Sequence, residues 1–472
     1  MLPKKYIDIN LINNNPNLSI NIIFAFFPIS MVCGNFIVNL NFLLFTIFGI
    51  VILKLKILKE KLDLPFKIIF LFFCFIIFST FVSLIIHFYN EESDYVDLNN
   101  LIKSIIFFRF FIILIIICLL NKMNILNFKY FVYVGTILTI LISLDVIFQY
   151  SFGFNIIGLP STDYHNSSFF GDELIAGGFI LRFSIFTLLF SIFLINKNKS
   201  INFFTITFLI CLLGMGILLS GNRMPLIFYF FALFLLLFFN RNLRKYFITG
   251  LLAFGVIFLV FISFDETYKK NYKSIYASTI NIGNLIISPL NKKSINNENQ
   301  NINKIEFGAI VPKYESAQRR LFLTAIDTWK FNKMSGNGFK SFRKVCQKLD
   351  EKFNMQEDMQ VYYIPHEASY EENRLCANHP HNYYFEILTE FGIIGILIVF
   401  IIMFLFLFFL FKNLKLFNKQ KLDFIILSAA ILSLILEMFP IKSTGSLVTS
   451  SNATYIILLA SIVLCNKKIL KM

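Results

Sequence analysis

The sequence is poor in charge: Asp, Glu, Lys and Arg make up 15% of its 472 residues, whereas 57% are hydrophobic. A typical soluble domain has about 25% charged residues, so this chain cannot cover a water-facing surface. Its apolar residues fall in blocks of about 20, and a helix of that length spans the roughly 30 Å hydrocarbon layer of a membrane. The composition therefore excludes a soluble globular protein and predicts an all-α integral membrane protein.

Several common motifs are also missing. The sequence has no G-x-x-x-x-G-K-[ST] loop for nucleotides and no D-x-D pattern for a divalent metal. We therefore expect neither a cofactor nor a metal, and we assign charge neutralisation to protein cations. No small-residue cleavage site follows the first apolar run, near Ile20, so no cleaved signal peptide is predicted. The net charge of +15 comes from Lys and Arg in short loops, where they orient membrane proteins, so no nucleic-acid partner is expected.

Twelve apolar segments are candidate membrane spans: 18–33, 36–54, 66–88, 101–120, 130–151, 173–195, 201–220, 224–240, 246–264, 393–411, 423–440 and 449–465. Eleven spans are the alternative, because the first and eighth are short and the last contains Ser and Asn. The loops between the spans alternate between strongly basic and nearly neutral or acidic. The basic set includes both termini, and by the positive-inside rule it faces the cytoplasm.

The longest loop, residues 265–392, then lies outside the cytoplasm. It contains an Asn/Lys/Ser-rich stretch from Asn291 to Lys304 that is predicted to be mobile. A helix-like run from Ser316 to Asn332 and an SGNG turn at 335–338 follow. Loops of this length usually have a function, so we predict a partly helical subdomain. The predicted organisation is an N-terminal bundle of about nine helices (1–264), the large loop (265–392) and about three C-terminal helices (393–472).

Two of the seven cysteines, Cys346 and Cys376, fall in the outer loop. An oxidising compartment favours a disulfide between them, which would brace the segment leading to His379 and His381. Two free thiols are the alternative. The other five lie in or at the ends of spans, where they serve as small apolar residues: Cys33, Cys74, Cys118, Cys211 and Cys465.

The densest polar cluster lies where the loop returns to the membrane, in Cys376-Ala-Asn-His-Pro-His-Asn382, with Glu390 following. A histidine at a membrane boundary can accept a proton near neutral pH. Pro380 stiffens the backbone between the two imidazoles, and Asn382 is placed to orient one of them. The alternatives are a plain polar loop and a metal site, for which His366 or nearby carboxylates offer the third ligand.

Four arginines are candidates for binding an anion. Arg223 lies in the outer turn Ser220-Gly-Asn-Arg223, and its planar fork suits a diphosphate; a side chain that snorkels to the headgroups is the alternative. Arg109, Arg182 and Asp145 lie inside predicted spans. Placing a charged side chain in the membrane costs at least ~2.5 kcal/mol, so such residues are functional candidates by default. A structural pair of Arg109 with Asp145 is the alternative. Arg320 in the loop is equally explained by a solvated helix face.

At these residues the sequence resembles the O-antigen ligase/polymerase superfamily of bacterial membrane glycosyltransferases. Five segments carry the resemblance: His381-Asn382-x-Tyr384 with Glu390-x-Gly392-x-x-Gly395, Ser220-Gly221-x-Arg223, Phe170-Gly171-Asp172-Glu173-Leu174-Ile175-x-Gly177 with Arg182, Asp145-x-x-x-Gln149-Tyr150-x-x-Gly153, and Gly336-x-Gly338-x-x-x-Phe342-Arg343. They follow the superfamily's HN…E-x-G-x-x-G element, its S-G-x-R turn, the opening of a central span, the segment before that span and the loop's G-x-G-x-x-x-F.

The resemblance implies a metal-independent, inverting glycosyl transfer on the periplasmic side of the bacterial inner membrane. The donor would be a glycan on undecaprenyl diphosphate, and the acceptor a sugar hydroxyl on lipid A–core for a ligase or on another lipid-linked glycan for a polymerase. Membrane lipids are the other expected partners. A ligase is favoured because the HN element matches best. A lipid-linked glycan flippase, from another class, is the further alternative, although the halves show no internal repeat.

The resemblance also implies roles for individual residues. Arg223 and Arg182 would stabilise the departing diphosphate. His381 would accept the proton of the acceptor hydroxyl, with His379 as the second candidate. The residues expected to contact substrate are His379, Asn382, Glu390, Asp145 and Arg320.

Overall fold

The computed structural model describes residues 16–59, 61–90, 97–162, 165–171, 173–195, 199–270, 272, 317–353, 361–364, 372–412, 421–443 and 445–465. Its membrane part is built of helices, because only a helix satisfies the backbone polar groups of a single apolar segment in lipid. The helices before the large loop are α1 (Pro16–Ala25), α2 (Phe27–Val32), α3 (Asn35–Leu53), α4 (Lys56–Lys59), α5 (Leu64–Asn90), α6 (Leu98–Phe107), α7 (Arg109–Lys122), α8 (Lys129–Phe152), α9 (Ala176–Ile195), α10 (Lys199–Leu219), α11 (Arg223–Phe239) and α12 (Arg244–Phe264). Those after it are α16 (Tyr383–Lys412), α17 (Leu422–Glu437) and α18 (Ser450–Cys465), and two short 3-10 turns are η2 (Ser168–Phe170) and η3 (Arg241–Leu243).

Every predicted span coincides with a helix in the described ranges. Seven helical segments there are long and apolar enough to cross a membrane, namely α3, α5, α6 with α7, α8, α9, α12 and α16. Shorter apolar helices occupy the remaining five predicted spans, namely α1 with α2, α10, α11, α17 and α18. The α-helical integral membrane class is therefore confirmed, and the count of twelve spans stays a prediction.

The core of the bundle is aromatic. Phe131 on α8 is fully buried, with its ring centroid 5.5 Å from that of Phe24 on α1 and 5.7 Å from that of Phe183 on α9. On the outer surface large apolar side chains are exposed, such as Phe36 and Phe264. A soluble protein would bury such residues, and here they form the face expected to contact lipid.

Two predicted spans are interrupted. The span near 101–120 breaks at Phe108, between α6 and α7, and the span near 18–33 breaks at Phe26, between α1 and α2. Arg109 begins α7, and its Nη2 donates to Asn39 Oδ1 at 2.6 Å and to Ser450 Oγ at 3.2 Å. The alternative structural pair of Arg109 with Asp145 was therefore wrong.

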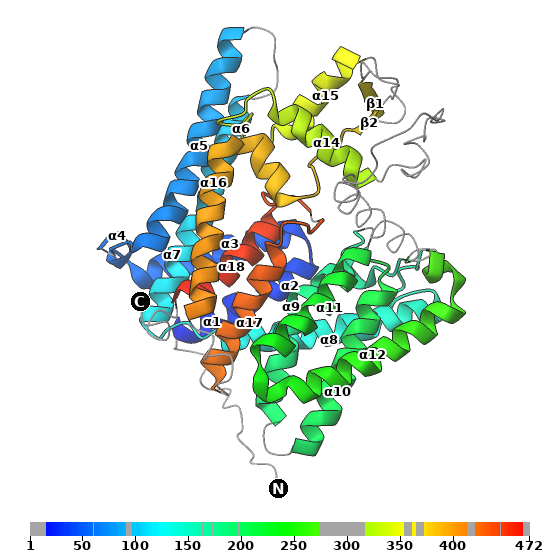
Figure 1. Ribbon diagram of the computed structural model, residues 1–472. Helices are drawn as coiled ribbons and strands as arrows, with labels where there is room; N and C mark the ends of the chain where they lie inside the picture. Colours follow the sequence, from blue (N-terminus) through cyan, green and yellow to red (C-terminus); the bar gives the residue numbers. More distant parts are fainter. Residues whose placement is uncertain are drawn as a thin grey trace, which may run out of the picture.

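The last part of the predicted outer loop is helical. Helix α16 begins at Tyr383, not near residue 393, and continues through a kink at Gly392, whose φ is 63° and ψ is −163°. The polar residues Glu386 and Glu390 were expected to precede the span and instead lie buried in the first turns of this helix. Figure 1 shows α16 in orange beside the long blue helix α5, which it contacts.

The large loop forms a small subdomain at one end of α5 and α16 (Figure 1). It contains α14 (Ala317–Trp329), close to the predicted helix-like run, and α15 (Phe342–Phe353). It also contains an antiparallel pair of strands, β1 (Val361–Ile364) and β2 (Glu372–Leu375), with Val361 opposite Leu375. The all-α prediction missed this pair. The stretch from Asn291 to Lys304 and His366 lie outside the described residues.

Candidate functional site

The segment from Cys376 to Asn382 carries the two histidines to the start of α16. The imidazole rings of His379 and His381 lie with their centroids 4.2 Å apart, and His381 adopts a left-handed φ of 54°. The Nε2 atom of His379 is buried without a hydrogen-bond partner among the described residues. The structure therefore places the two predicted histidines together, next to the first turn of α16.

Asn382 connects this segment to the end of α17. Its Oδ1 accepts from the backbone N–H groups of Tyr384 (2.9 Å) and Phe385 (3.2 Å), which caps α16. Its Nδ2 donates to the carbonyl oxygens of Pro440 (2.7 Å) and Lys442 (3.3 Å). These bonds join the α16 start to the turn after α17, and the orientation of an imidazole by Asn382 stays a prediction.

Beyond this link lies a buried ionic cluster centred on Glu437, the last residue of α17. Its Oε1 accepts from Arg182 Nη2 at 2.7 Å and from Tyr383 OH at 2.8 Å, and its Oε2 accepts from Lys442 Nζ at 2.6 Å. Arg182 Nη2 also donates to Asn452 Oδ1 at 2.6 Å. One carboxylate thus holds an arginine from α9, a lysine from the turn after α17, and Tyr383, the residue that follows Asn382.

The guanidinium of Arg182 is fixed from several sides. Besides Glu437 and Asn452, it lies 5.0 Å from the ring centroid of Tyr455, whose hydroxyl donates to the Arg182 carbonyl oxygen at 2.6 Å. The bonds to neighbouring side chains use Nε and Nη2. Among the described residues none engages Nη1, and the side chain remains 19% exposed. Arg182 therefore presents one side of its fork to a ligand.

The turn that carries Arg223 is held on both sides. A Cβ on Gly177, at the start of α9, would lie 2.3 Å from Ser220 Oγ, so the two segments make contact only because residue 177 is glycine. Asn166 Nδ2 and Tyr268 OH donate to the Leu219 carbonyl oxygen at 2.7 and 2.8 Å. These contacts explain why the segments opening α9 and ending α10 both carry recognisable motifs.

Arg223 itself is exposed at the first residue of α11. One to two turns further along this helix, Phe228 and Phe231 pack on Phe439. Their ring centroids lie 5.5 and 5.2 Å from that of Phe439. Phe439 is two residues from Glu437. The first part of α11 therefore packs on the same turn that carries the ionic cluster.

Asp145 serves the loop between α8 and α9. It is fully buried, and its carboxylate accepts from Ser168 Oγ at 2.5 Å and from the Ile156 N–H at 2.9 Å. Gln149, one turn on, accepts from the Ser168 N–H at 2.8 Å and donates to the carbonyl oxygens of Leu159 and Pro160. The structure thus gives Asp145 a role in shaping this loop and does not bring it to the ionic cluster.

The SGNG turn is built into the membrane bundle. The N–H groups of Asn337 and Gly338 each donate at 2.9 Å, to the carbonyl oxygens of Thr389 and Glu390 at the kink of α16. From α5, Ser83 Oγ donates to the Gly336 carbonyl oxygen at 3.1 Å, and Ser79 Oγ to that of Ser335 at 2.5 Å. The G-x-G and E-x-G motifs therefore meet in one backbone-to-backbone contact.

Glu386 and Glu390 lie one helical turn apart on α16, next to this contact. Glu386 accepts from Ser446 Oγ and from the Leu447 N–H, the latter at 2.6 Å. Glu390 interacts with the backbone N–H of Lys340, and its Oε2 is buried with no partner in the described part of the chain. Burial lowers the pKa of the Lys340 ammonium. Glu390, predicted to bind substrate, thus faces the loop subdomain.

The two predicted loop cysteines lie within bonding distance, and the structure joins Cys346 to Cys376. Close by, Thr324 Oγ1 on α14 bonds to the carbonyl oxygen and N–H of Leu375. Arg320 lies one turn before Thr324, and its Nε is buried without a partner among the described residues. The structure also joins Cys118 to Cys465, a pairing not expected from the sequence, where both were interpreted as small apolar residues.

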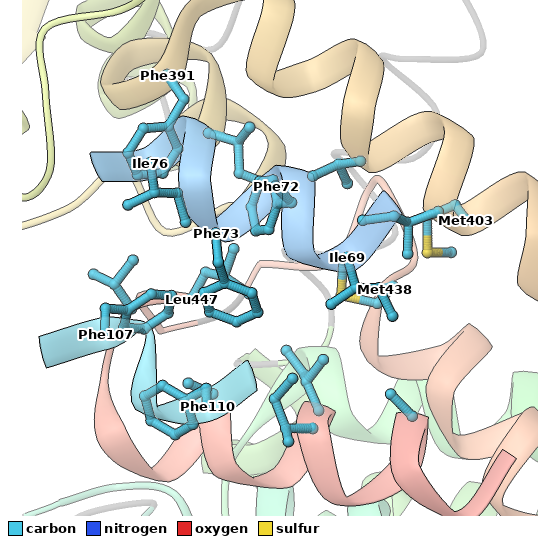
Figure 2. Close-up of a pocket in the computed structure, with 18 of the residues that line it drawn as sticks. Ile69, Phe72, Phe73, Ile76, Phe107, Phe110, Phe391, Met403, Met438 and Leu447 are labelled. Atoms are coloured by element: carbon cyan, nitrogen blue, oxygen red, sulfur yellow. The ribbon is translucent and has the colours of Figure 1, made fainter. Parts of the chain in front are cut away.

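An apolar cavity of about 100 Å³ lies between α5, α16, α17 and α18 (Figure 2). Its wall includes Phe72, Phe391 and Met403, and it reaches Met438 and Leu447. Met438 follows Glu437 directly, and the N–H of Leu447 is bonded to Glu386. An apolar chamber in the membrane part therefore adjoins the polar cluster.

The matched region of the chain can now be compared with this geometry. Residues 206–400 match the family model described as O-antigen ligase. This segment is similar to O-antigen ligases. It contains the turn of Arg223, the SGNG turn, both histidines and the kink of α16, and it supports the O-antigen ligase superfamily for the chain. No curated protein matches the sequence.

Several residues of the site lie outside the matched segment 206–400, and three of them were not predicted from the sequence. Glu437, Lys442 and Asn452 all follow residue 400: Glu437 and Asn452 accept hydrogen bonds from Arg182, and Lys442 donates to Glu437. Glu437 lies in a predicted span, and an acidic residue there is a functional candidate by the same rule that selected Arg182. Within the described ranges no group of three His, Cys, Asp or Glu side chains could hold a metal ion.

The environment of His379 weakens its ability to accept a proton. Burial, together with the neighbouring His381, lowers the pKa of His379 from 6.5 to about 4. In the unfolded chain His379 gains a proton below pH 6.5, but in the folded protein it does so only near pH 4. Stability should therefore fall as the pH drops from 6.5 to 4. We expect the melting temperature of purified protein to follow this trend and His379→Asn to flatten it; an equally steep fall in the variant would contradict the assignment.

Proposed function

We propose that the chain is an O-antigen ligase-like glycosyltransferase that moves a glycan from undecaprenyl diphosphate to a sugar hydroxyl of lipid A–core on the periplasmic side of the inner membrane. The observation that carries this proposal is the linkage of the histidine segment to the ionic cluster. Asn382 bonds to the backbone of Lys442, and Tyr383 bonds to the Glu437 that holds Arg182. The segment that carries His381 is thus bonded to the cluster that contains the cations Arg182 and Lys442.

The chemistry requires both kinds of group. The bond between the anomeric carbon and the diphosphate oxygen breaks while a bond to the acceptor oxygen forms on the opposite face, which inverts the configuration. Negative charge grows on the departing diphosphate, and Arg182 and Arg223 are the cations assigned to it. Losing one such preorganised contact costs about 3–4 kcal/mol of barrier. Because protein cations carry this charge, the proposed reaction is metal-independent.

The proton of the acceptor hydroxyl goes to His381. A general base works best when its pKa lies near the working pH. Burial holds the pKa of His379 at about 4, so that imidazole is a weak acceptor at neutral pH. We therefore assign the base to His381 and leave His379, Asn382, Glu390 and Arg320 as residues that position substrate or the base.

The apolar cavity supports a lipid-linked donor. Its lining side chains are all hydrophobic, and it ends at residues next to Glu437 and Glu386. A membrane-bound donor needs its diphosphate at the polar boundary and its isoprenoid chain in an apolar environment. The cavity, beside the cluster, offers an apolar environment for only the first part of the isoprenoid chain, nearest the diphosphate.

The test is product formation by purified protein in nanodiscs. Fluorescent glycan on undecaprenyl diphosphate should yield a new covalent product with lipid A–core, together with released undecaprenyl diphosphate. Product formed only with a second lipid-linked glycan would establish a polymerase. Movement of the donor between leaflets without any new covalent product would establish a flippase and refute the transferase.

A further inference from the structure

Lys442 is the one basic residue of the otherwise neutral outer segment 441–448. Its side chain is 11% exposed, and its Nζ lies 2.6 Å from Glu437 Oε2. Burial lowers the pKa of this ammonium, against the opposing effect of Glu437. Desolvating a lysine is costly, so its presence in this place calls for a reason beyond solubility or orientation in the membrane.

The charges of the cluster do not balance. Arg182 and Lys442 contribute two positive charges, and Glu437 contributes one negative charge. Glu437 is the only carboxylate among the described residues that either cation contacts. A buried site with net positive charge in a poorly polarisable environment is unfavourable unless an anion completes it. The cluster is therefore short of one anionic ligand.

The two cations are held very differently. Arg182 bonds to Glu437 and Asn452 and packs on the Tyr455 ring, so its position is fixed. Lys442 has a single hydrogen bond from an ammonium with three donors, on a stem of four methylene groups. Its ammonium can therefore move several ångströms while Glu437 keeps Arg182 and Tyr383 as partners.

We propose that Lys442 is an exchangeable cation of the donor site, paired with Glu437 in the empty protein and transferred to the diphosphate of the lipid-linked donor when it binds. Glu437 serves as the placeholder that keeps the ammonium in reach. The assignment rests on the proposed function for the identity of the anion. It adds to Arg182 and Arg223 a third cation, one that lies outside the matched segment 206–400.

The test is lipid binding by full-length protein in nanodiscs, which needs no catalysis. The probes are undecaprenyl diphosphate and undecaprenol, which share the isoprenoid chain and differ in charge. The variant Lys442→Gln retains a donor for Glu437 but carries no charge, and Lys442→Arg retains the charge. Lys344→Met is the matched control, because Lys344 also pairs with a carboxylate, Asp97 at 3.2 Å, in the outer subdomain.

We expect Lys442→Gln to weaken binding of undecaprenyl diphosphate by about tenfold or more and to leave binding of undecaprenol unchanged. Lys442→Arg should recover at least part of the preference for the diphosphate, and Lys344→Met should behave as wild type. Wild-type preference in Lys442→Gln would overturn the proposal, as would equal losses for both lipids. Should Lys442→Gln not fold, binding of the same two lipids is measured with Lys442→Met, for which the same result is expected.

The outcomes separate this inference from the proposed function. If Lys442→Gln loses the preference while wild-type protein forms no covalent product, the lipid-diphosphate site stands and the transferase is refuted. If wild-type protein forms product and Lys442→Gln binds both lipids normally, the transferase stands and Lys442 is a structural ion pair.

Discussion

Replacing His381 with Ala is expected to lower the rate of glycan transfer by about 10²- to 10⁴-fold, the range for loss of a positioned general base. The acceptor hydroxyl is a poor nucleophile until its proton is taken, and His381 is the imidazole assigned to take it. The measurement is kcat with saturating donor and acceptor. Binding of undecaprenyl diphosphate should change little, because the cations are untouched.

The control for this prediction is His379→Asn. The ring centroid of His379 lies 4.2 Å from that of His381. If His381 is the base, His379→Asn should lose much less activity than His381→Ala. A His381→Ala protein with wild-type kcat would reject the assignment. A larger loss in His379→Asn than in His381→Ala would transfer the role to His379.

The helices of the membrane part were predictable from the sequence because their segments are long apolar runs. Their breaks were not, because they depend on partners remote in the chain. Arg109 begins α7 after a break at Phe108, where its guanidinium reaches Asn39 and Ser450. Likewise α16 begins at Tyr383, since Asn382 caps it and Glu386 finds partners at Ser446 and Leu447. Because the first turns of α16 contain polar residues, hydropathy alone predicts a loop there.

The candidate site was predictable as a set of residues and not as an arrangement. Arg182 was selected because buried charge is rare, but its partner Glu437 is 255 residues away. Lys442 bonds to Glu437, so the cluster that includes it could not be predicted before Glu437 was placed beside Arg182. Asp145 was selected by the same rule and anchors a loop, so the rule finds buried charge without distinguishing structural from ligand-binding roles.

Gly392→Ala is expected to be among the most damaging single-methyl changes in the protein. Gly392 has a φ of 63° and a ψ of −163°, a region essentially restricted to glycine. A Cβ there would lie 2.2 Å from the Met334 carbonyl oxygen and 2.6 Å from the Gly336 nitrogen. Neither neighbour is a flexible side chain. The combined strain and overpacking should lower the free energy of unfolding by at least about 3 kcal/mol.

The matched control is Gly255→Ala on α12, where a Cβ would meet nothing within 4 Å and the change should stay within about 1 kcal/mol. Melting temperature in detergent and limited proteolysis of the loop subdomain are the two measurements. Because the SGNG turn bonds directly to the kink, Gly392→Ala should expose residues 317–353 to protease before the bundle unfolds. A variant that melts and resists protease like Gly255→Ala would show that the loop docks without this backbone contact. The histidine segment would then be positioned chiefly by Asn382 and the Cys346–Cys376 link, both of which reach it independently of the kink.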